Sequence, residues 1–160
     1  MAMHLTGQYP RWWSGKRFDS PVRAWASGVT GESTRDVVQA KLFGPPDRPE
    51  DWGTGMLPGA SIGDIATARG RAGAIDMCPI KHASGGWSSL AFKSYEQGRE
   101  KWQGSALEVV WMDEEPPDAL YYEALTRTNE TGGVIFITCT PLMGMSKIMR
   151  MFLMGDDSES

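Results

Sequence analysis

Two short apolar runs in the second half of the chain each lead into polar residues. Residues 109–112, Val-Val-Trp-Met, precede an acidic triplet at 113–115 and a double proline, and residues 134–137, Val-Ile-Phe-Ile, precede Thr138 and Thr140. Short apolar runs rich in β-branched and aromatic residues predict buried strands. We therefore expect two strands whose ends carry charged or hydroxyl side chains.

The segment between these strands has the pattern of an amphipathic helix. It runs from Asp118, the expected cap, to Thr128, and Gly132-Gly133 ends it. A strand, a helix and a second strand predict a right-handed crossover between parallel strands. The acidic triplet and the two threonines would then meet at one edge of the sheet, where open α/β sheets bind ligands.

The acidic triplet carries the strongest candidate chemistry. Because buried carboxylates are costly unless they are compensated, Asp113, Glu114 and Glu115 suggest a site for hydrated Mg²⁺ with nucleotide phosphates. In phosphoryl transfer one such acid holds the metal and a neighbour orients the attacking water. Strand alternation predicts Asp113 and Glu115 on one face and Glu114 on the other. The alternative is a solvated acidic turn, with Thr138 and Thr140 serving only in capping or turns.

The remaining pattern predicts further elements along the chain. We expect these to be a strand at 22–26, a helix at 30–43, an irregular loop at 44–60, a short helix at 62–69, a hairpin of strands at 75–81 and 88–94, a loop or helical turn at 95–102, and an apolar C-terminal helix bearing Met143, Met145, Met149, Met151 and Met154. Trp25 and Trp111 fall within strands and are predicted to be core residues.

Composition is that of one folded domain of 160 residues, with 41% hydrophobic and 22% charged residues. No apolar run approaches the roughly 20 residues that span a bilayer, and the start lacks a secretory pattern. The two cysteines, Cys78 and Cys139, are predicted to be buried free thiols.

Charge is unevenly distributed along the chain. The net charge of −4 argues against a protein whose whole surface binds nucleic acid, yet basic residues exceed acidic ones between 67 and 101. The basic residues there are Arg69, Arg71, Lys81, Lys93, Arg99 and Lys101. Such an excess contacts DNA phosphates only if the side chains cluster in space, and otherwise it is a solvated face.

Several segments together resemble the large subunit of tailed-phage terminases, the ATP-driven motor that packages DNA into procapsids. The segments that carry the resemblance are His4-Leu5-Thr6-Gly7, Tyr9-Pro10, Trp12-Trp13, Pro21-Val22-Arg23-Ala24-Trp25, Thr34-Arg35-Asp36-Val37, Gly53-Thr54-Gly55, Leu57-Pro58, Ser84-Gly85-Gly86, Phe92-Lys93-Ser94-Tyr95-Glu96-Gln97-Gly98, the acidic triplet, and Thr138-Cys139-Thr140-Pro141-Leu142. Their order and spacing are more specific than any one of them.

The resemblance implies roles for individual residues. Asp113 would be the acid of the Walker B segment that holds Mg²⁺ through water, and Glu114 the catalytic carboxylate that acts on ATP. Thr138 and Thr140 would form the coupling motif that senses phosphate and links hydrolysis to movement. Arg99 lies where an arginine finger would reach a neighbouring subunit's nucleotide. Its alternative is an ordinary surface pair with Glu96 or Glu100.

The resemblance also implies a fold and partners. The fold would be an α/β, RecA-like P-loop NTPase (ASCE) core, a mostly parallel sheet flanked by helices, with the strand at 22–26 next to the phosphate-loop strand. Partners would be double-stranded viral DNA, the portal protein, the small terminase subunit and further copies in a homo-oligomeric ring on the procapsid. The setting would be the cytoplasm of the bacterial host, with no membrane.

One departure from the family is plain. No G-x-x-x-x-G-K-[ST] loop is present, and the only Gly-Lys pair, Gly15-Lys16, is followed by Arg17. Because residues 1–5 resemble the tail of the phosphate-loop helix, we expect a fragment that lacks the phosphate-loop strand and helix and is inactive alone. Residues 1–155 would be a partial ATPase domain and 156–160 the start of a truncated linker. The alternatives are a non-catalytic prophage remnant and a fragment of another P-loop motor, such as a helicase.

Overall fold

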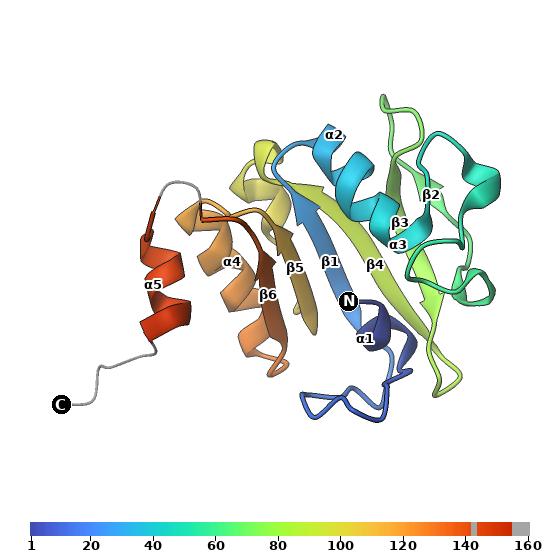
Figure 1. The fold of residues 1–160 in the computed structure, drawn as a ribbon, viewed down its shortest axis with the longest axis horizontal. Helices are drawn as coiled ribbons and strands as arrows, with labels where there is room; N and C mark the ends of the chain where they lie inside the picture. Colours follow the sequence, from blue (N-terminus) through green and yellow to red (C-terminus); the bar gives the residue numbers. More distant parts are fainter. Residues whose placement is uncertain (142–143, 155–160) are drawn as a thin grey trace.

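A computed structural model describes residues 1–141 and 144–154. Its centre is a six-stranded sheet with the strand order β2-β3-β4-β1-β5-β6 (Figure 1). The strands are β1 (Arg23–Gly28), β2 (Ala66–Thr67), β3 (Ile75–Lys81), β4 (Trp87–Ser94), β5 (Val109–Asp113) and β6 (Val134–Thr138). The α/β class and the main strands predicted from the sequence are confirmed.

Four neighbouring strands, β4, β1, β5 and β6, run parallel, and β2 and β3 continue the sheet antiparallel. The predicted crossover is confirmed, because β5 pairs in parallel with β6. The predicted hairpin is confirmed as β3 and β4. The strand predicted at 22–26 is β1, which lies between β4 and β5 and is hydrogen-bonded to both of them.

One face of the sheet is covered by α1 (Ala2–Thr6) and by a continuous helical segment. That segment consists of α2 (Gly31–Ser33), the π-helical η1 (Thr34–Gln39) and α3 (Ala40–Phe43). Thr30 and Ser33 form a reciprocal capping box at its start, as the expected helix requires. Buried apolar side chains from these helices and the sheet form the first core: Leu5, Val38, Leu42, Phe43, Ile80, Leu90 and Trp111 are among them.

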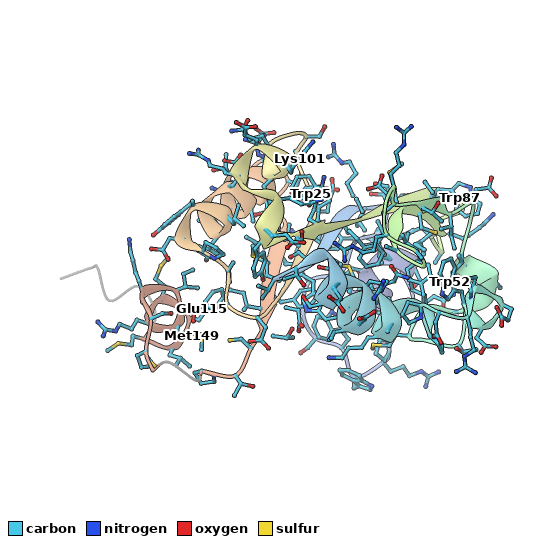
Figure 2. The ribbon with its side chains drawn as sticks, turned by 90° about the horizontal axis from the view of Figure 1, so that it is seen from above. Trp25, Trp52, Trp87, Lys101, Glu115 and Met149 are labelled. Atoms are coloured by element: carbon cyan, nitrogen blue, oxygen red, sulfur yellow. The ribbon has the colours of Figure 1, made fainter. Side chains whose placement is uncertain are left out.

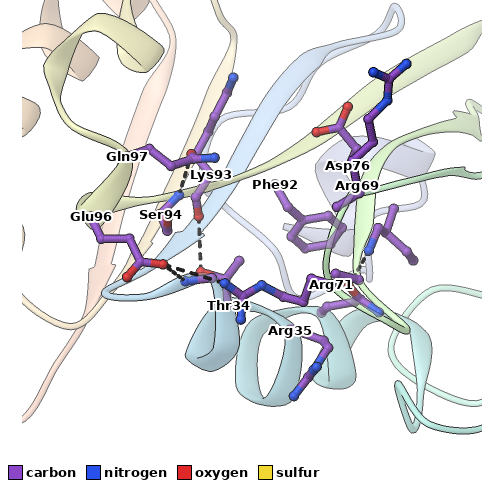
Figure 3. A pocket seen from close by; sticks show the side chains of 15 residues that line it. Thr34, Arg35, Arg69, Arg71, Asp76, Phe92, Lys93, Ser94, Glu96 and Gln97 are labelled. Carbon is purple, nitrogen blue, oxygen red and sulfur yellow. Dashed lines mark hydrogen bonds and ion pairs between the residues drawn. The ribbon is translucent and has the colours of Figure 1, made fainter.

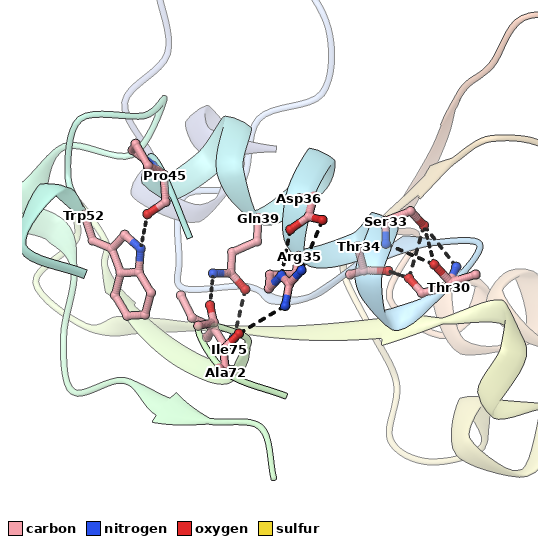
Figure 4. A network of polar contacts seen from close by, with 11 residues as sticks. Thr30, Ser33, Thr34, Arg35, Asp36, Gln39, Pro45, Trp52, Ala72 and Ile75 are labelled. Carbon is pink, nitrogen blue, oxygen red and sulfur yellow. Dashed lines mark hydrogen bonds and ion pairs between the residues drawn. The ribbon is translucent and has the colours of Figure 1, made fainter. Parts of the chain in front are cut away.

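The side chain of Gln39 joins this helix to the sheet. Its Nε2 donates to the carbonyl of Gly73 (2.7 Å), and its Oε1 accepts from the amide of Ile75 (2.8 Å) (Figure 4). Gln39 is 1% exposed, so both of its polar atoms need these partners. The amide thus completes the backbone hydrogen bonding where β3 begins.

The other face of the sheet is covered over β1, β5 and β6. Here lie α4 (Asp118–Asn129), the 3₁₀ turns η4 (Tyr95–Gln97) and η5 (Arg99–Trp102), and α5 (Lys147–Met154). The second core includes Trp102, Val110, Met112, Leu120 and Ile148. Met143, which we assigned to the C-terminal helix, and the linker at 156–160 lie outside the described residues.

Two local predictions are wrong. Residues 62–69 do not form a helix, because Ile62 pairs with Ile80 and Ala66–Thr67 pairs with β3 as strand β2, so sheet pairing satisfies this backbone. Asp118 is the first residue of α4 and not its cap, because Pro117 holds the cap position. The long loop also contains two short 3₁₀ turns, η2 (Pro49–Asp51) and η3 (Gly59–Ser61).

Trp111 is buried, as predicted, whereas Trp25 is only half-buried. Both cysteines are free thiols; Cys78 is buried and Cys139 is partly exposed. Among the described residues, no helix has the length and apolar character needed to cross a membrane.

Candidate functional site at the tips of β5 and β6

The ends of β5 and β6 bring an acid and a hydroxyl together. Asp113 and Thr138 are direct partners in the β5–β6 register. Thr138 Oγ1 donates a hydrogen bond to Asp113 Oδ1 (2.6 Å) and accepts one from Trp111 Nε1 (2.8 Å). The predicted meeting of the acidic triplet with the threonines at the carboxyl edge is therefore confirmed for this pair.

Glu114 adopts an unusual backbone conformation immediately after β5. Its φ is 68°, and it is the only residue other than glycine with a positive φ among those the structure describes. Its amide donates to the carbonyl of Thr138 (2.8 Å), and its side chain is exposed. A left-handed residue that is not glycine costs about 1 kcal/mol or more and is concentrated at functional sites.

This turn also corrects the predicted side-chain alternation. β5 ends at Asp113, and the left-handed turn at Glu114 breaks the strand, so strand alternation does not determine the directions of Glu114 and Glu115. Glu115 is half-buried and is followed by a buried Pro116. The three carboxylates are therefore presented by a turn and not by the two faces of a strand.

Tyr95 holds this turn from the neighbouring η4. Its hydroxyl donates to the backbone carbonyls of Glu114 (2.7 Å) and Asp113 (3.0 Å). Tyr95 is 8% exposed, and burial raises the pKa of its phenol above the ordinary value, so the hydroxyl remains a donor. Sequence reasoning missed this residue, because nothing in the pattern around it signals a contact with a carbonyl 18 residues away.

The local field at the strand tips is negative. Burial first, and then the charges of Glu115, Glu114 and Asp113, raise the pKa of the nearby Cys139 thiol. Within residues 1–141 and 144–154, no three His, Cys, Asp or Glu side chains converge as a metal cage. The oxygen donors present, Asp113 with Thr138 beside it and the exposed Glu114, fit Mg²⁺ that keeps most of its waters. They do not fit a metal bound by protein ligands alone.

Arg99 is engaged in an ion pair within the chain. Its Nε donates to Glu123 Oε2 (3.1 Å), and Arg127 Nη2 lies 3.1 Å from the other oxygen of the same carboxylate. The alternative given for Arg99, a surface pair with Glu96 or Glu100, is wrong in its partner, because Arg99 pairs with Glu123, whose side chain is 6% exposed and also pairs with Arg127. The Arg99 side chain is still 64% exposed. These contacts join η5 to α4.

The remaining candidates lie apart from this pair. Thr140 is exposed and lies beyond the end of β6, and Leu142 of the same segment lies outside the described residues. Lys16, from the only Gly-Lys pair, donates to the carbonyl of Gly132. Gly132 precedes β6, whereas Asp113 is the last residue of the parallel strand β5. Lys16 therefore lies at the amino ends of these strands and cannot contact a phosphate at their carboxyl ends.

The fold and the sequence of this chain are each similar to those of known proteins. The fold is similar to that of the large terminase from a thermophilic bacteriophage, solved in complex with ADP, with a TM-score of 0.51 and 13% identity over 76% of this chain and 26% of that one. The chain is 39% identical over 170 residues to the large terminase subunit of Salmonella phage P22. That alignment covers 96% of this chain and 34% of the P22 protein, so the chain spans about a third of its relative.

The sheet order and this structural similarity therefore define an α/β domain with the fold of a large terminase. The family model described as "Terminase large subunit, T4likevirus-type, N-terminal" matches residues 1–160. The chain belongs to the terminase large subunit family, and the resemblance drawn from its sequence is confirmed.

Proposed function

We propose that the protein to which this chain belongs hydrolyses ATP and uses the energy to package viral DNA into a procapsid. This chain would contribute the acidic strand tip and the coupling segment of that motor. The family membership supports the proposal, as does the ADP held by the terminase of the thermophilic phage. The observation that carries it is the left-handed Glu114 directly after Asp113, clamped by Tyr95 and Thr138 at the carboxyl edge of the sheet.

Each residue at the tip has a distinct role in the proposal. Asp113 holds hydrated Mg²⁺, whose positive charge offsets the charge that develops on the phosphates. Glu114, exposed on its turn, accepts a proton from the attacking water. Thr138 fixes the Asp113 carboxylate, and Thr140 reports the state of the phosphate to the rest of the chain.

Arg99 is proposed as an arginine finger that acts on the nucleotide of a neighbouring copy. The Arg99 guanidinium donates a hydrogen bond to Glu123 through Nε and its side chain is exposed, so it is able to exchange partners. Partners in this proposal are double-stranded DNA, the portal protein, the small terminase subunit and further copies in a ring. The motor would act in the cytoplasm of the bacterial host.

The proposal is tested by ATP hydrolysis in a chain that has a phosphate loop fused ahead of Met1. Glu114→Gln keeps the shape but cannot accept a proton, so ATP should still bind while turnover falls by about 100-fold or more. Asp113→Asn should weaken both Mg²⁺–ATP binding and turnover. Glu115→Gln is the matched control and should lose much less.

A chain with the loop that does not hydrolyse ATP, or one in which Glu115→Gln is the more damaging change, would overturn the assignment. The 160-residue chain without the loop should hydrolyse ATP no faster than its Glu114→Gln variant, because it lacks the main contacts to the β- and γ-phosphates.

A further inference from the structure

The outer face of the β3–β4 hairpin is the face opposite the first core. Cross-strand partners share a face, and Lys81 pairs with Trp87 while Met77 pairs with Ala91. Lys93 stands two residues beyond Ala91 on β4 and therefore shares this face. Met77 and Trp87 are 48% and 51% exposed, so the described elements leave this part of the sheet largely open to solvent.

Basic side chains from separate elements gather along this face. Figure 3 shows Arg69 and Lys93 pointing away from the side of the sheet on which Arg35 and Arg71 lie, with Asp76 beside Arg69. Burial lowers the pKa of the Lys93 ammonium, the charge of Asp76 raises it and the charge of Lys101 lowers it, so both charges act on Lys93. Figure 2 shows Lys101, Trp25 and Trp87 on the same side of the sheet, away from Trp52.

Aromatic rings position two of these cations. The Lys93 Nζ atom lies 4.9 Å from the centroid of the Trp25 ring, and the Lys81 Nζ atom lies 5.2 Å from that of Trp87. Both ammonium groups are thereby held in place, so less side-chain entropy is lost when they bind an anion. Trp87 and Lys93 are six residues apart on β4, so the two cation sites are separated by roughly 20 Å.

We propose that this face, formed by Arg69, Lys81, Lys93 and Lys101, contacts the phosphate backbone of duplex DNA. The four cations outnumber Asp76, which lies beside Arg69, and Asp64, which lines a pocket with Pro79 and Trp87, and a row of this length matches a duplex that carries one charge per about 1.7 Å. This assignment rests on the proposed DNA-packaging function and names the surface involved.

Two features favour a duplex over other occupants. Protein–protein interfaces are depleted in lysine at their centres, whereas this face has three lysines and only Met77 and Trp87 as large exposed apolar groups among the described residues. The exposed Trp87 ring already has Lys81 over it, which disfavours stacking of a base from a single strand. We therefore expect the ammonium groups of this face to contact the phosphates of a duplex.

The test is binding of a short labelled duplex to the 160-residue chain, followed by fluorescence anisotropy across a salt series. Lys81→Gln with Lys101→Gln, both at exposed positions, should weaken binding about tenfold and reduce the slope of log affinity against log salt by about 1.8, which is two released counterions. The matched control is Lys41→Gln with Arg48→Gln, which removes two exposed cations from α3 and the following loop. It should change affinity less than about twofold.

Equal losses in the two double variants, or no duplex binding by the unaltered chain at low salt, would overturn the proposal. Tighter binding of single strands would overturn it as well, because the face would then contact bases. So would self-association in sedimentation that Lys81→Gln with Lys101→Gln abolishes, because the face would then bind a second copy of the chain. Thermal melts establish that each variant is folded. Glu114→Gln should bind the duplex normally, so failure of the ATPase assignment and failure of this one are separable.

Discussion

The hydroxyl of Thr138 donates to the carboxylate of Asp113 across 2.6 Å and at the same time accepts from the Trp111 indole. This one oxygen links the two strand tips to a buried ring of the core. Thr138→Val keeps the shape but leaves the Trp111 N–H without its partner, so it should destabilise the chain by about 1–2 kcal/mol. Thermal or urea unfolding measures this.

Thr140→Val is the matched control for Thr138→Val, because Thr140 is exposed beyond the end of β6. It should leave stability within about 0.5 kcal/mol. In a chain supplied with a phosphate loop, Thr140→Val should leave hydrolysis partly intact while uncoupling it from DNA movement. Equal losses of stability in the two variants would show that the Thr138 contacts contribute nothing particular.

The left-handed backbone of Glu114 predicts an unusual order of stabilities. Glycine adopts φ near 68° without penalty, so Glu114→Gly should be more stable than Glu114→Ala by about 1 kcal/mol, the reverse of what an ordinary strand position shows. Both variants lose the carboxylate and should lose hydrolysis alike in a chain with a phosphate loop. Chemical unfolding gives the comparison, and Ala being the more stable variant would contradict the described turn.

Tyr95→Phe removes the hydroxyl that binds the carbonyls of Asp113 and Glu114 and leaves the ring in its core position. We expect a loss of about 1–1.5 kcal/mol in unfolding free energy. Turnover by a chain with a phosphate loop should fall as well, because Glu114 would no longer be held on its turn. Tyr122→Phe, at an exposed position of α4, provides the control.

Glu123 is buried between Arg99 and Arg127, so it should be sensitive even to an isosteric change. Glu123→Gln removes the charge that both guanidinium groups share and should lower unfolding free energy by about 2 kcal/mol. Glu130→Gln, exposed just after the same helix, should have little effect. A thermal melt of the two variants decides the matter, and equal melting temperatures would contradict the bridging role.

His4 predicts a pH dependence of stability. Burial first, and then the charge of the N-terminus, lower its pKa from 6.5 to about 4 in the folded chain. The neutral ring fits its contact with the Tyr9 hydroxyl (3.0 Å). Because the unfolded chain binds a proton at higher pH than the folded one, stability is full above pH 6.5 and falls as pH drops toward 4. The decline between about pH 7 and pH 5 should be shallower in His4→Gln, measured by urea unfolding.

The sequence is sufficient to predict the strands, the crossover and the meeting of Asp113 with Thr138, because each rests on local apolar patterns and on the handedness of parallel connections. It does not predict Tyr95 at the strand tips or Glu123 as the partner of Arg99, because such contacts depend on how separate elements pack. The break in alternation after Asp113 was also missed. Glycine and asparagine are the residues that signal left-handed turns from sequence, and Glu114 is neither.

The sequence also does not predict which charged side chains lie close together in space. The basic excess between 67 and 101 divides between the two sides of the sheet, since Arg71 lies toward α2 while Arg69 and Lys93 point the other way. Arg99 forms an ion pair with Glu123. Only the topology distinguishes which of these cations are neighbours.

The amide of Gln39, fixed between Gly73 and Ile75, has a consequence for strand register. If β3 slipped by one residue against β4, Met77 and Pro79 would replace Cys78 and Ile80 in the core. The same slip would carry the Ile75 amide away from Gln39 and leave two buried polar atoms without partners. A helix side chain therefore sets the alignment of a hairpin that begins 36 residues further along the chain.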